Sequence, residues 1–160
     1  MKSPQGRGLA IYMRLVTRVA VRVKIKIRNR ATGDTIETNA LINSGFEATT
    51  RKLLIPHKLA TELKLWPPRE VATKKFGTAG GEIGMPVIPE SIEVKLVLER
   101  DMPWIVCDVV VSFLEKEVLI SDKLGGALGI VIEDLAEGVW RHKEDDYETK
   151  RQTYPPQYWE

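Results

Sequence analysis

The residues with the clearest chemical pattern in this 160-residue chain are Asn43, Ser44 and Gly45. They follow an apolar pair, Leu41 and Ile42, which is predicted to end a strand buried in the core. A buried strand end fixes the backbone, so the next side chain projects from a defined place. Ser44 adds a hydroxyl group, and Gly45 permits a positive φ that a β-carbon would penalise. The same residues also fit an ordinary exit from a strand into a turn.

A glycine-rich tip is the second candidate element, between strand-like arms at 71–76 and 82–87. Glycines give such a tip the freedom to move. A phosphate-binding loop is one alternative, but no Gly-Lys-Ser/Thr follows and the tip does not lead into a helix. An ordinary hairpin turn is the other alternative. The tip consists of Gly77, Thr78, Ala79, Gly80 and Gly81.

The stretch from Leu41 to Gly45 resembles the active-site motif of the single-domain retropepsin-like aspartic peptidases. That motif has two apolar residues, then Asp, then Thr or Ser, then Gly. Asn43 stands where the family has its catalytic Asp, and Ser44 and Gly45 take the supporting positions. In this family the hairpin at 77–81 would be the flap, which closes over bound peptide and contributes backbone hydrogen bonds.

The second stretch that carries the resemblance runs from Leu119 to Asp122. Retropepsin-like chains have an apolar pair here, then Gly, then an Asp that opens a short helix near the site, and then a last strand. Ser121 stands at the usual Gly position. Asp122 is predicted to be the N-cap of a helix over 124–128 and to have a structural role near the site. Residues 130–132 would form the last strand of the core.

The resemblance implies a mostly-β protein with a closed β-barrel-like retropepsin (acid protease) fold and one or two short helices. It also implies a homodimer, because the catalytic unit of the family is a pair of Asp side chains, one from each subunit. One carboxylate acts as a general base on water while its protonated partner polarises the scissile carbonyl. The implied activity is that of an aspartic endopeptidase acting on peptides or proteins, with no cofactor and no metal.

Asn43 removes the group that this chemistry needs. A carboxamide neither accepts a proton from water at useful pH nor donates one as a carboxylic acid does. Glu47 is too far along the turn to substitute for it, and Asp122 is not a substitute either, so we expect no peptidase activity from the chain as written. The alternative function is a non-catalytic peptide-binding or scaffolding dimer of the same fold. Asn43 has three explanations: an introduced inactivating replacement, a natural feature of a binding protein, or deamidation to Asp after synthesis.

The charge balance argues against a general polyanion binder, because 29% of the residues are charged but the net charge is only +2. The one feature that could bind phosphates is a basic row along the first strand. Such a row is more often a solvated strand face, and no aromatic residues interleave with it as single-strand binding would favour. Nucleic acid is therefore not an expected partner. The row consists of Arg18, Arg22, Lys24, Lys26, Arg28 and Arg30.

Periodicity predicts the other elements. Alternating apolar and basic residues indicate a strand over 18–28, which a turn at 29–34 joins to a strand over Thr35–Ile42. Residues 57–63 have a helical apolar face. Residues 92–98 and 104–111 indicate a further hairpin.

The expected organisation is a flexible tail over 1–14, one domain over 15–140, and a polar C-terminal tail over 141–160 that is either disordered or packed on a partner. No apolar run approaches the roughly 18–20 residues that span a membrane, and no secretory signal is evident. The expected location is therefore cytoplasmic, without a membrane partner. The single cysteine, Cys107, lies in an apolar run and is predicted to be a buried thiol.

Overall fold

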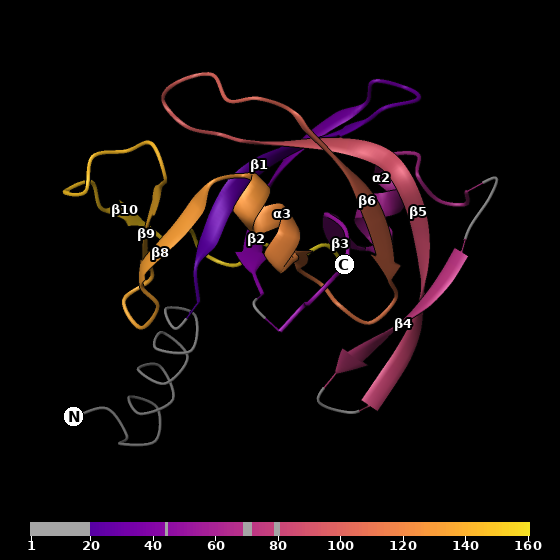
Figure 1. Ribbon diagram of the computed structural model, residues 1–160. Helices are drawn as coiled ribbons and strands as arrows, with labels where there is room; N and C mark the ends of the chain where they lie inside the picture. Colours follow the sequence, from indigo (N-terminus) through magenta and orange to yellow (C-terminus); the bar gives the residue numbers. More distant parts are fainter. Residues whose placement is uncertain (1–19, 44, 69–71, 79–80) are drawn as a thin grey trace, which may run out of the picture.

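This computed structural model describes residues 20–43, 45–68, 72–78 and 81–160 (Figure 1). These residues contain ten strands and two short helices. The protein is therefore mostly β, as predicted. In chain order the elements are β1 (Arg22–Asn29), β2 (Thr35–Ile42), β3 (Lys52–Pro56), α2 (His57–Glu62), β4 (Ala72–Thr78), β5 (Gly81–Leu96), β6 (Ile105–Ser112), β7 (Val118–Ile120), α3 (Asp122–Ala127), β8 (Ile130–Asp134), β9 (Val139–His142) and β10 (Arg151–Gln152).

Six of the strands form a closed barrel in the order β1-β2-β7-β3-β6-β5, and pairing between β5 and β1 completes the ring. The barrel is mixed: β2 and β7 are parallel, as are β3 and β6, and the remaining neighbours are antiparallel. β4 pairs with the outer part of β5 and extends the sheet beyond the ring. This confirms the predicted closed β-barrel, and the described residues contain two short helices where one or two were expected.

The first hairpin follows the predicted alternation. Val23, Ile25 and Ile27 of β1 are fully buried in the barrel interior, while the intervening basic residues are half-buried. β2 has the predicted bounds, and the turn between the strands contains Gly33 at φ 82°. A residue with a β-carbon would be strained at that φ, so glycine suits the turn. Apolar burial on one face therefore sets the register of this hairpin.

β5 is one long curved strand, although the sequence pattern indicated two separate strands over 82–87 and 92–98. Its outer part pairs with β4 and its inner part with β1 and β6. The register against β6 shifts between Ile88 and Ile92, where Glu90 takes a positive φ of 49°. This bulge bends the strand from the hairpin into the barrel wall, because an extra residue on one strand increases local bend and twist.

The predicted last core strand is not part of the barrel. Residues 130–132 belong to β8, which pairs with β9 in a separate three-stranded sheet of order β10-β9-β8. The chain leaves the barrel after β7, forms α3 and turns at Gly129, whose φ is 76° and where a β-carbon would collide with the His142 ring. Glycine therefore suits this turn between α3 and β8.

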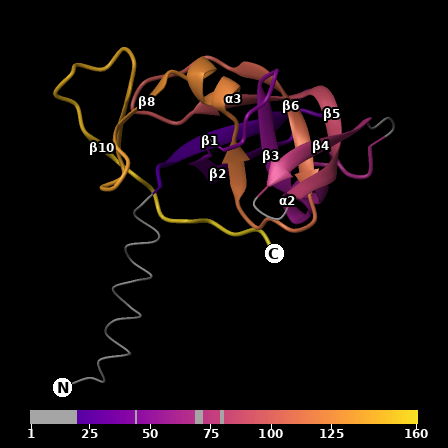
Figure 2. The ribbon, with the colours of Figure 1, turned by 60° about the horizontal axis from the view of Figure 1, so that its bottom comes forward.

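The C-terminal segment lies against the barrel instead of forming a free tail. The backbone N–H of Tyr154 donates to the Arg22 carbonyl at 3.0 Å, and Trp159 Nε1 donates to the Thr38 hydroxyl at 3.0 Å. Figure 2 shows this segment, in yellow, running beneath the barrel towards its end. On β2, the pairing with β7 is limited to the last residues of the strand. The C-terminal segment contacts β2 just before these residues, at Thr38.

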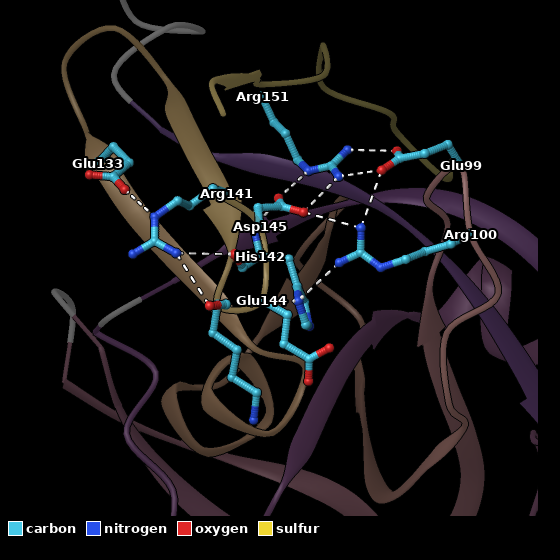
Figure 3. Close-up of polar contacts among 9 residues, drawn as sticks. Glu99, Arg100, Glu133, Arg141, His142, Glu144, Asp145 and Arg151 are labelled. Atoms are coloured by element: carbon cyan, nitrogen blue, oxygen red, sulfur yellow. Dashed lines mark hydrogen bonds and ion pairs between the residues drawn. The ribbon is translucent and has the colours of Figure 1, made fainter. Parts of the chain in front are cut away.

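An ion-pair cluster fastens this segment to the connection between β5 and β6 (Figure 3). Arg151 binds Glu99 through both guanidinium NH2 groups, at 2.7 and 2.9 Å, and donates from Nε to Asp145 at 2.8 Å. Arg100 donates to Asp145 as well, at 3.1 Å. Only 4% of the Asp145 side chain is exposed. The Arg151 hydrogen bond is the largest cause that holds the pKa of Asp145 well below its usual range, and it lowers the pKa of Glu99 to about 2.

An Arg151→Met variant is therefore expected to lose stability in a pH-dependent way. Both carboxyl groups have a lower pKa in the folded chain than in the unfolded chain, so their stabilisation is complete above the unfolded value of about 4. It is lost as pH falls through the folded values. Thermal melts should show the largest gap between wild type and variant near neutral pH and a smaller gap towards pH 2. The exposed neighbour variant Lys150→Met is the control, and a gap that stays constant with pH would contradict the prediction.

Candidate functional site

Asn43 lies where β2 ends against β7. Its backbone N–H donates to the Ile120 carbonyl at 3.2 Å, so the pairing of the two strands continues past Ile42. Its side-chain Oδ1 accepts from the Gly45 N–H at 3.0 Å, and its carbonyl accepts from the Phe46 N–H at 3.0 Å. Asn43 is half-buried and Gly45 is exposed. The predicted tight turn is present here, while Ser44 lies outside the described residues.

The two motif stretches meet at this turn. The Asp122 N–H donates to the Phe46 carbonyl at 3.2 Å, and Asp122 Oδ1 accepts from the Ala48 N–H at 3.2 Å. The same carboxylate oxygen accepts from the Lys123 N–H at 2.8 Å. Asp122 therefore clamps the loop that follows Asn43 to the start of α3, although 74 residues separate it from Ala48 in sequence.

Ser121, not Asp122, is the N-cap of α3, which corrects the sequence prediction. Its hydroxyl oxygen accepts from the Leu124 N–H at 3.2 Å and from the Lys52 N–H at 3.1 Å. The Ser121 N–H in turn donates to the Lys52 carbonyl at 3.2 Å. Ser121 is fully buried, so one serine serves both the helix start and the beginning of β3. The prediction chose Asp122 because either residue type is a good N-cap, and sequence alone does not fix the helix start.

A Ser121→Ala variant is expected to unfold about 1–2 kcal/mol more easily, because two buried backbone N–H groups lose their acceptor. Urea denaturation followed by circular dichroism measures this cost. Ser91→Ala is the control, since among the residues that the structure describes the Ser91 hydroxyl makes one bond, which it donates to the Ile88 carbonyl. Equal destabilisation by the two substitutions would show that Ser121 does not have the role that its hydrogen bonds indicate.

The glycine-tipped hairpin forms as predicted. β4 and β5 pair antiparallel from Ala72 opposite Val87 to Thr78 opposite Gly81, with Gly77 opposite Glu82. Ala79 and Gly80, the predicted tip, lie outside the described residues. The hairpin extends from the barrel wall on the right of Figure 1. The pairing of β4 with β5 shows a hairpin, and its role as a flap stays a prediction.

An apolar cluster covers the outer face of the barrel beside Asn43, and we call it the outer cluster. On β3, β6 and β7 its members alternate with residues of the main core: Leu54 lies between the core residues Leu53 and Ile55, for example. Leu41 and Ala48 pack against it. Sequence analysis did not identify it, because a run that is apolar on both faces does not show which face is outside. Its buried members are Phe46, Leu54, Met85, Val87, Val110 and Leu119.

A buried ion pair lies under the loop that leads into β3. Only 2% of the Lys52 side chain is exposed, and its Nζ donates to Asp108 Oδ2 at 3.1 Å and contacts the Thr50 hydroxyl. The Glu90 N–H donates to Asp108 at 2.8 Å, and the Thr50 hydroxyl donates to it at 2.7 Å. Burial alone would raise the pKa of Asp108, but bonds from Thr50, Glu90 and Lys52 outweigh it and lower the pKa.

An open groove of about 690 Å³ lies beside this ion pair, between α3 and the loop at 49–51. Its lining includes Asp108, Asp122, Arg51 and Lys123, so acidic and basic groups are mixed. Within the described residues, no group of three or more His, Cys, Asp or Glu side chains is arranged to hold a metal ion.

Arg18 of the basic row lies outside the described residues, and most of the other members are paired with acids. Arg22 binds Glu117 at 2.6 Å and Arg28 binds Glu93 at 2.6 Å, while Lys24 lies 3.9 Å from Glu37. Charges that acids neutralise contribute little to a polyanion site.

Two other sequence features have a plain structural reading. Cys107 is 3% exposed, and burial raises the pKa of its thiol to about 12, which confirms the predicted buried thiol. Among the described residues, no helix is long and apolar enough to cross a membrane.

Comparison with known proteins assigns no family: no protein-family model matches the chain, and no curated protein matches it. The class that fold and site define is a mostly-β protein with a closed six-stranded mixed barrel and a polar turn at the end of β2.

Proposed function

We propose that this chain is a retropepsin-like domain that works as a homodimer and binds extended polypeptide in a cleft beside Asn43. The observation that carries the proposal is the contact between the two motif stretches. The Asp122 N–H and carboxylate hold the loop after Asn43, although nothing in local sequence requires residues 43–48 and 121–122 to meet. Convergence of two weak motifs at one place is more specific than either motif alone.

The surroundings of Asn43 suit a polypeptide ligand. The outer cluster lies under the loop that follows Asn43, with each of its buried members at most 9% exposed, and the β4–β5 hairpin is anchored in the wall that carries part of this cluster, through Met85 and Val87. An extended peptide would pair with backbone groups of the hairpin, while the buried cluster holds the wall behind it in place.

The chemistry that each subunit can contribute depends on Asn43. Its Oδ1 already accepts the Gly45 N–H, and its amide nitrogen can only donate. Two copies brought together would place two carboxamides where the family has two carboxyl groups, so water would lack a general base. The chain as written is therefore a binder of polypeptide, and Asp at position 43 would make it a peptidase.

The proposed homodimer has its interface at the turn after β2, because the family's paired site needs one side chain at position 43 from each subunit. Asn43 is half-buried and Gly45 is exposed, so part of this turn is open to a second copy of the chain. Both ribbon views place the β8–β9 hairpin away from the β4–β5 hairpin (Figures 1 and 2).

The proposed function is tested by binding and size together. Sedimentation velocity on the full chain should show a dimer, and labelled unfolded casein should bind saturably and stay uncut. Native bovine serum albumin, which offers no long extended segment, is the control ligand and should not bind. A dimer that does not bind unfolded casein would contradict the proposal. So would a protein that sediments as a monomer at every concentration.

The alternative is a non-catalytic scaffolding or peptide-binding dimer that gains no activity from Asp at position 43. Asn43 itself favours it, since a binding protein has no need of the carboxyl group. The paired digestion described in the Discussion separates the two.

A further inference from the structure

A cavity of about 270 Å³ lies beside the ion-pair cluster that Figure 3 shows. Three parts of the chain line it: the connection between β5 and β6, the end of α3, and the loop after β9. Its apolar wall includes Leu96, Met102 and Leu128, each at most 8% exposed. Arg100 and His142, which also line it, bond to one another within the cluster. The cavity therefore combines an apolar wall with a few polar side chains, the usual composition of a small-molecule site.

The neutral ring of His142 carries its hydrogen on Nε2. Its Nδ1 accepts from the Glu144 backbone N–H at 3.1 Å and lies 3.3 Å from Arg100 Nη2. A backbone N–H and a guanidinium group can only donate, so Nδ1 must be the acceptor of both. Burial, followed by the charge of Arg100, lowers the pKa of His142, so the ring is neutral at pH 7. Nε2–H is therefore a hydrogen-bond donor.

This donor has no acceptor within the described residues, although His142 is only 4% exposed. Nε2 keeps some contact with solvent, because it is not one of the side-chain nitrogens that are both fully buried and unpaired. A β-carbon on Gly129 would lie 2.5 Å from Nε2, so this edge of the ring is at the turn after α3. Ala127 and Leu128, just before that turn, line the cavity. An acceptor that enters the cavity would meet an unused donor on a buried ring.

The charges around the cavity favour an anionic acceptor. Within the described residues Arg100 uses three of its five N–H groups, so two remain. Lys143 is exposed, lines the cavity and makes no ion pair in that part of the chain. Asp101 lines it as well, but it binds Lys95 at 2.9 Å. Glu144 is the remaining carboxylate in the lining, and it opposes an anion from an exposed position.

Size and chemistry narrow the ligand further. A cavity of about 270 Å³ is near the lower end of the range for ligand pockets, so the ligand must be small. A protonated Nε2 cannot bind a metal ion, which needs the free electron pair of a ring nitrogen. A carboxylate suits the site better, because its two oxygens can accept from a ring N–H and a guanidinium group together.

We propose that this cavity binds a small carboxylic acid with an aliphatic body, whose carboxylate accepts the Nε2–H of His142 and the unused N–H groups of Arg100. The aliphatic body packs on the apolar wall, and the Lys143 ammonium adds an exposed positive charge. Asn43 is not part of the lining, so the inference is independent of the proposed function.

The test titrates the full chain with sodium 4-methylpentanoate at pH 7 and follows its backbone amides by proton–nitrogen NMR. The amide signals of Leu128, Lys143 and Glu144 should shift saturably, with a Kd on the order of 1–10 mM for a ligand of this size. The alcohol 4-methylpentan-1-ol keeps the aliphatic body and lacks the carboxylate. It should bind at least about tenfold more weakly, because hydrogen bonds to a charged group are lost.

Four variants locate the carboxylate. His142→Asn keeps an acceptor in the place of Nδ1 and has no group in the place of Nε2, so Kd should rise at least about tenfold. Lys143→Met should raise Kd about two- to fivefold, and Glu144→Gln should lower it by a similar factor, the scale of exposed charge pairs. Lys58→Met changes an exposed lysine of α2 outside the lining and should leave Kd as in wild type.

Each outcome decides the inference. A protein whose signals do not shift saturably at tens of millimolar acid overturns the site, and equal Kd values for the acid and the alcohol overturn the recognition of a carboxylate. A folded His142→Asn variant that binds as wild type overturns the role of Nε2. If circular dichroism shows that this variant is unfolded, the opposite shifts expected for Lys143→Met and Glu144→Gln decide instead, and shifts in the same direction overturn the proposal.

Discussion

An Asn43→Asp variant is expected to cleave an unfolded protein that the chain with Asn43 leaves intact, with a gain in kcat/KM of at least about 10³-fold, the scale of general acid–base catalysis. The introduced carboxyl groups of two subunits would share one proton, so that one carboxylate activates water while the other polarises the scissile carbonyl. The rate should form a bell over about pH 3 to 7, because both the doubly ionised and the doubly protonated pair are inactive.

Two controls tie this gain to the paired site. Asn43→Ala, purified in the same way, should remain inactive, which excludes a contaminating peptidase. Excess wild-type protein, mixed with the Asn43→Asp variant and allowed to exchange subunits, should lower the variant's rate, because mixed dimers carry one carboxyl group only. Activity that excess wild type does not affect would argue against a shared site. If neither form cuts and both are dimers, the protein is better understood as a binding module.

The strands that could be predicted from the sequence are those in which apolar residues and buried positions alternate with the same period of two. The alternation of Val23, Ile25 and Ile27 with basic residues indicated β1, and the paired strand that follows was predicted with its observed bounds, Thr35–Ile42. One buried face and one solvated face leave a period of two in the sequence, and that period also sets the register.

The sequence was less informative where both faces of a strand are apolar. β3 has five buried residues in a row, so its pattern did not show that Leu54 points outward while Leu53 and Ile55 point inward. The outer cluster, and with it the position of Phe46, depends on this difference. Only the barrel shows which side of the wall each residue is on.

Long-range contacts explain the other differences. The polar segment over 141–160 was expected to be either a disordered tail or packed on a partner, yet Arg151 binds Glu99 and Trp159 reaches Thr38 of the same chain. The turn at Gly129 between α3 and β8 lies against the ring of His142, which is on another strand, β9. Pairings of this kind are set by tertiary structure and leave no local period in the sequence.

Lys52 and Asp108 are the pair whose separation is expected to cost the fold most. Asp108→Asn would leave the Lys52 ammonium without its carboxylate at a place where only 2% of the side chain is exposed. Removing one partner of a buried ion pair typically costs about 3–5 kcal/mol, because the remaining charge is desolvated without compensation. Urea denaturation at fixed protein concentration measures the loss.

The two partners should not be equivalent. Asp108 is 14% exposed, borders the open groove, and keeps its bonds from Thr50 and the Glu90 N–H when Lys52 is replaced. A Lys52→Met variant therefore leaves a carboxylate that is still solvated and hydrogen-bonded. It should cost clearly less than Asp108→Asn, by a margin of about 1 kcal/mol or more.

The double variant Lys52→Met with Asp108→Asn completes the comparison. It removes both charges, so its cost should fall short of the sum of the single costs by about 0.5–3 kcal/mol, the range for residues in direct contact. Additive costs would mean that the two charges do not stabilise one another. An equal cost for the two single variants would mean that solvent from the groove reaches Lys52 as well as Asp108.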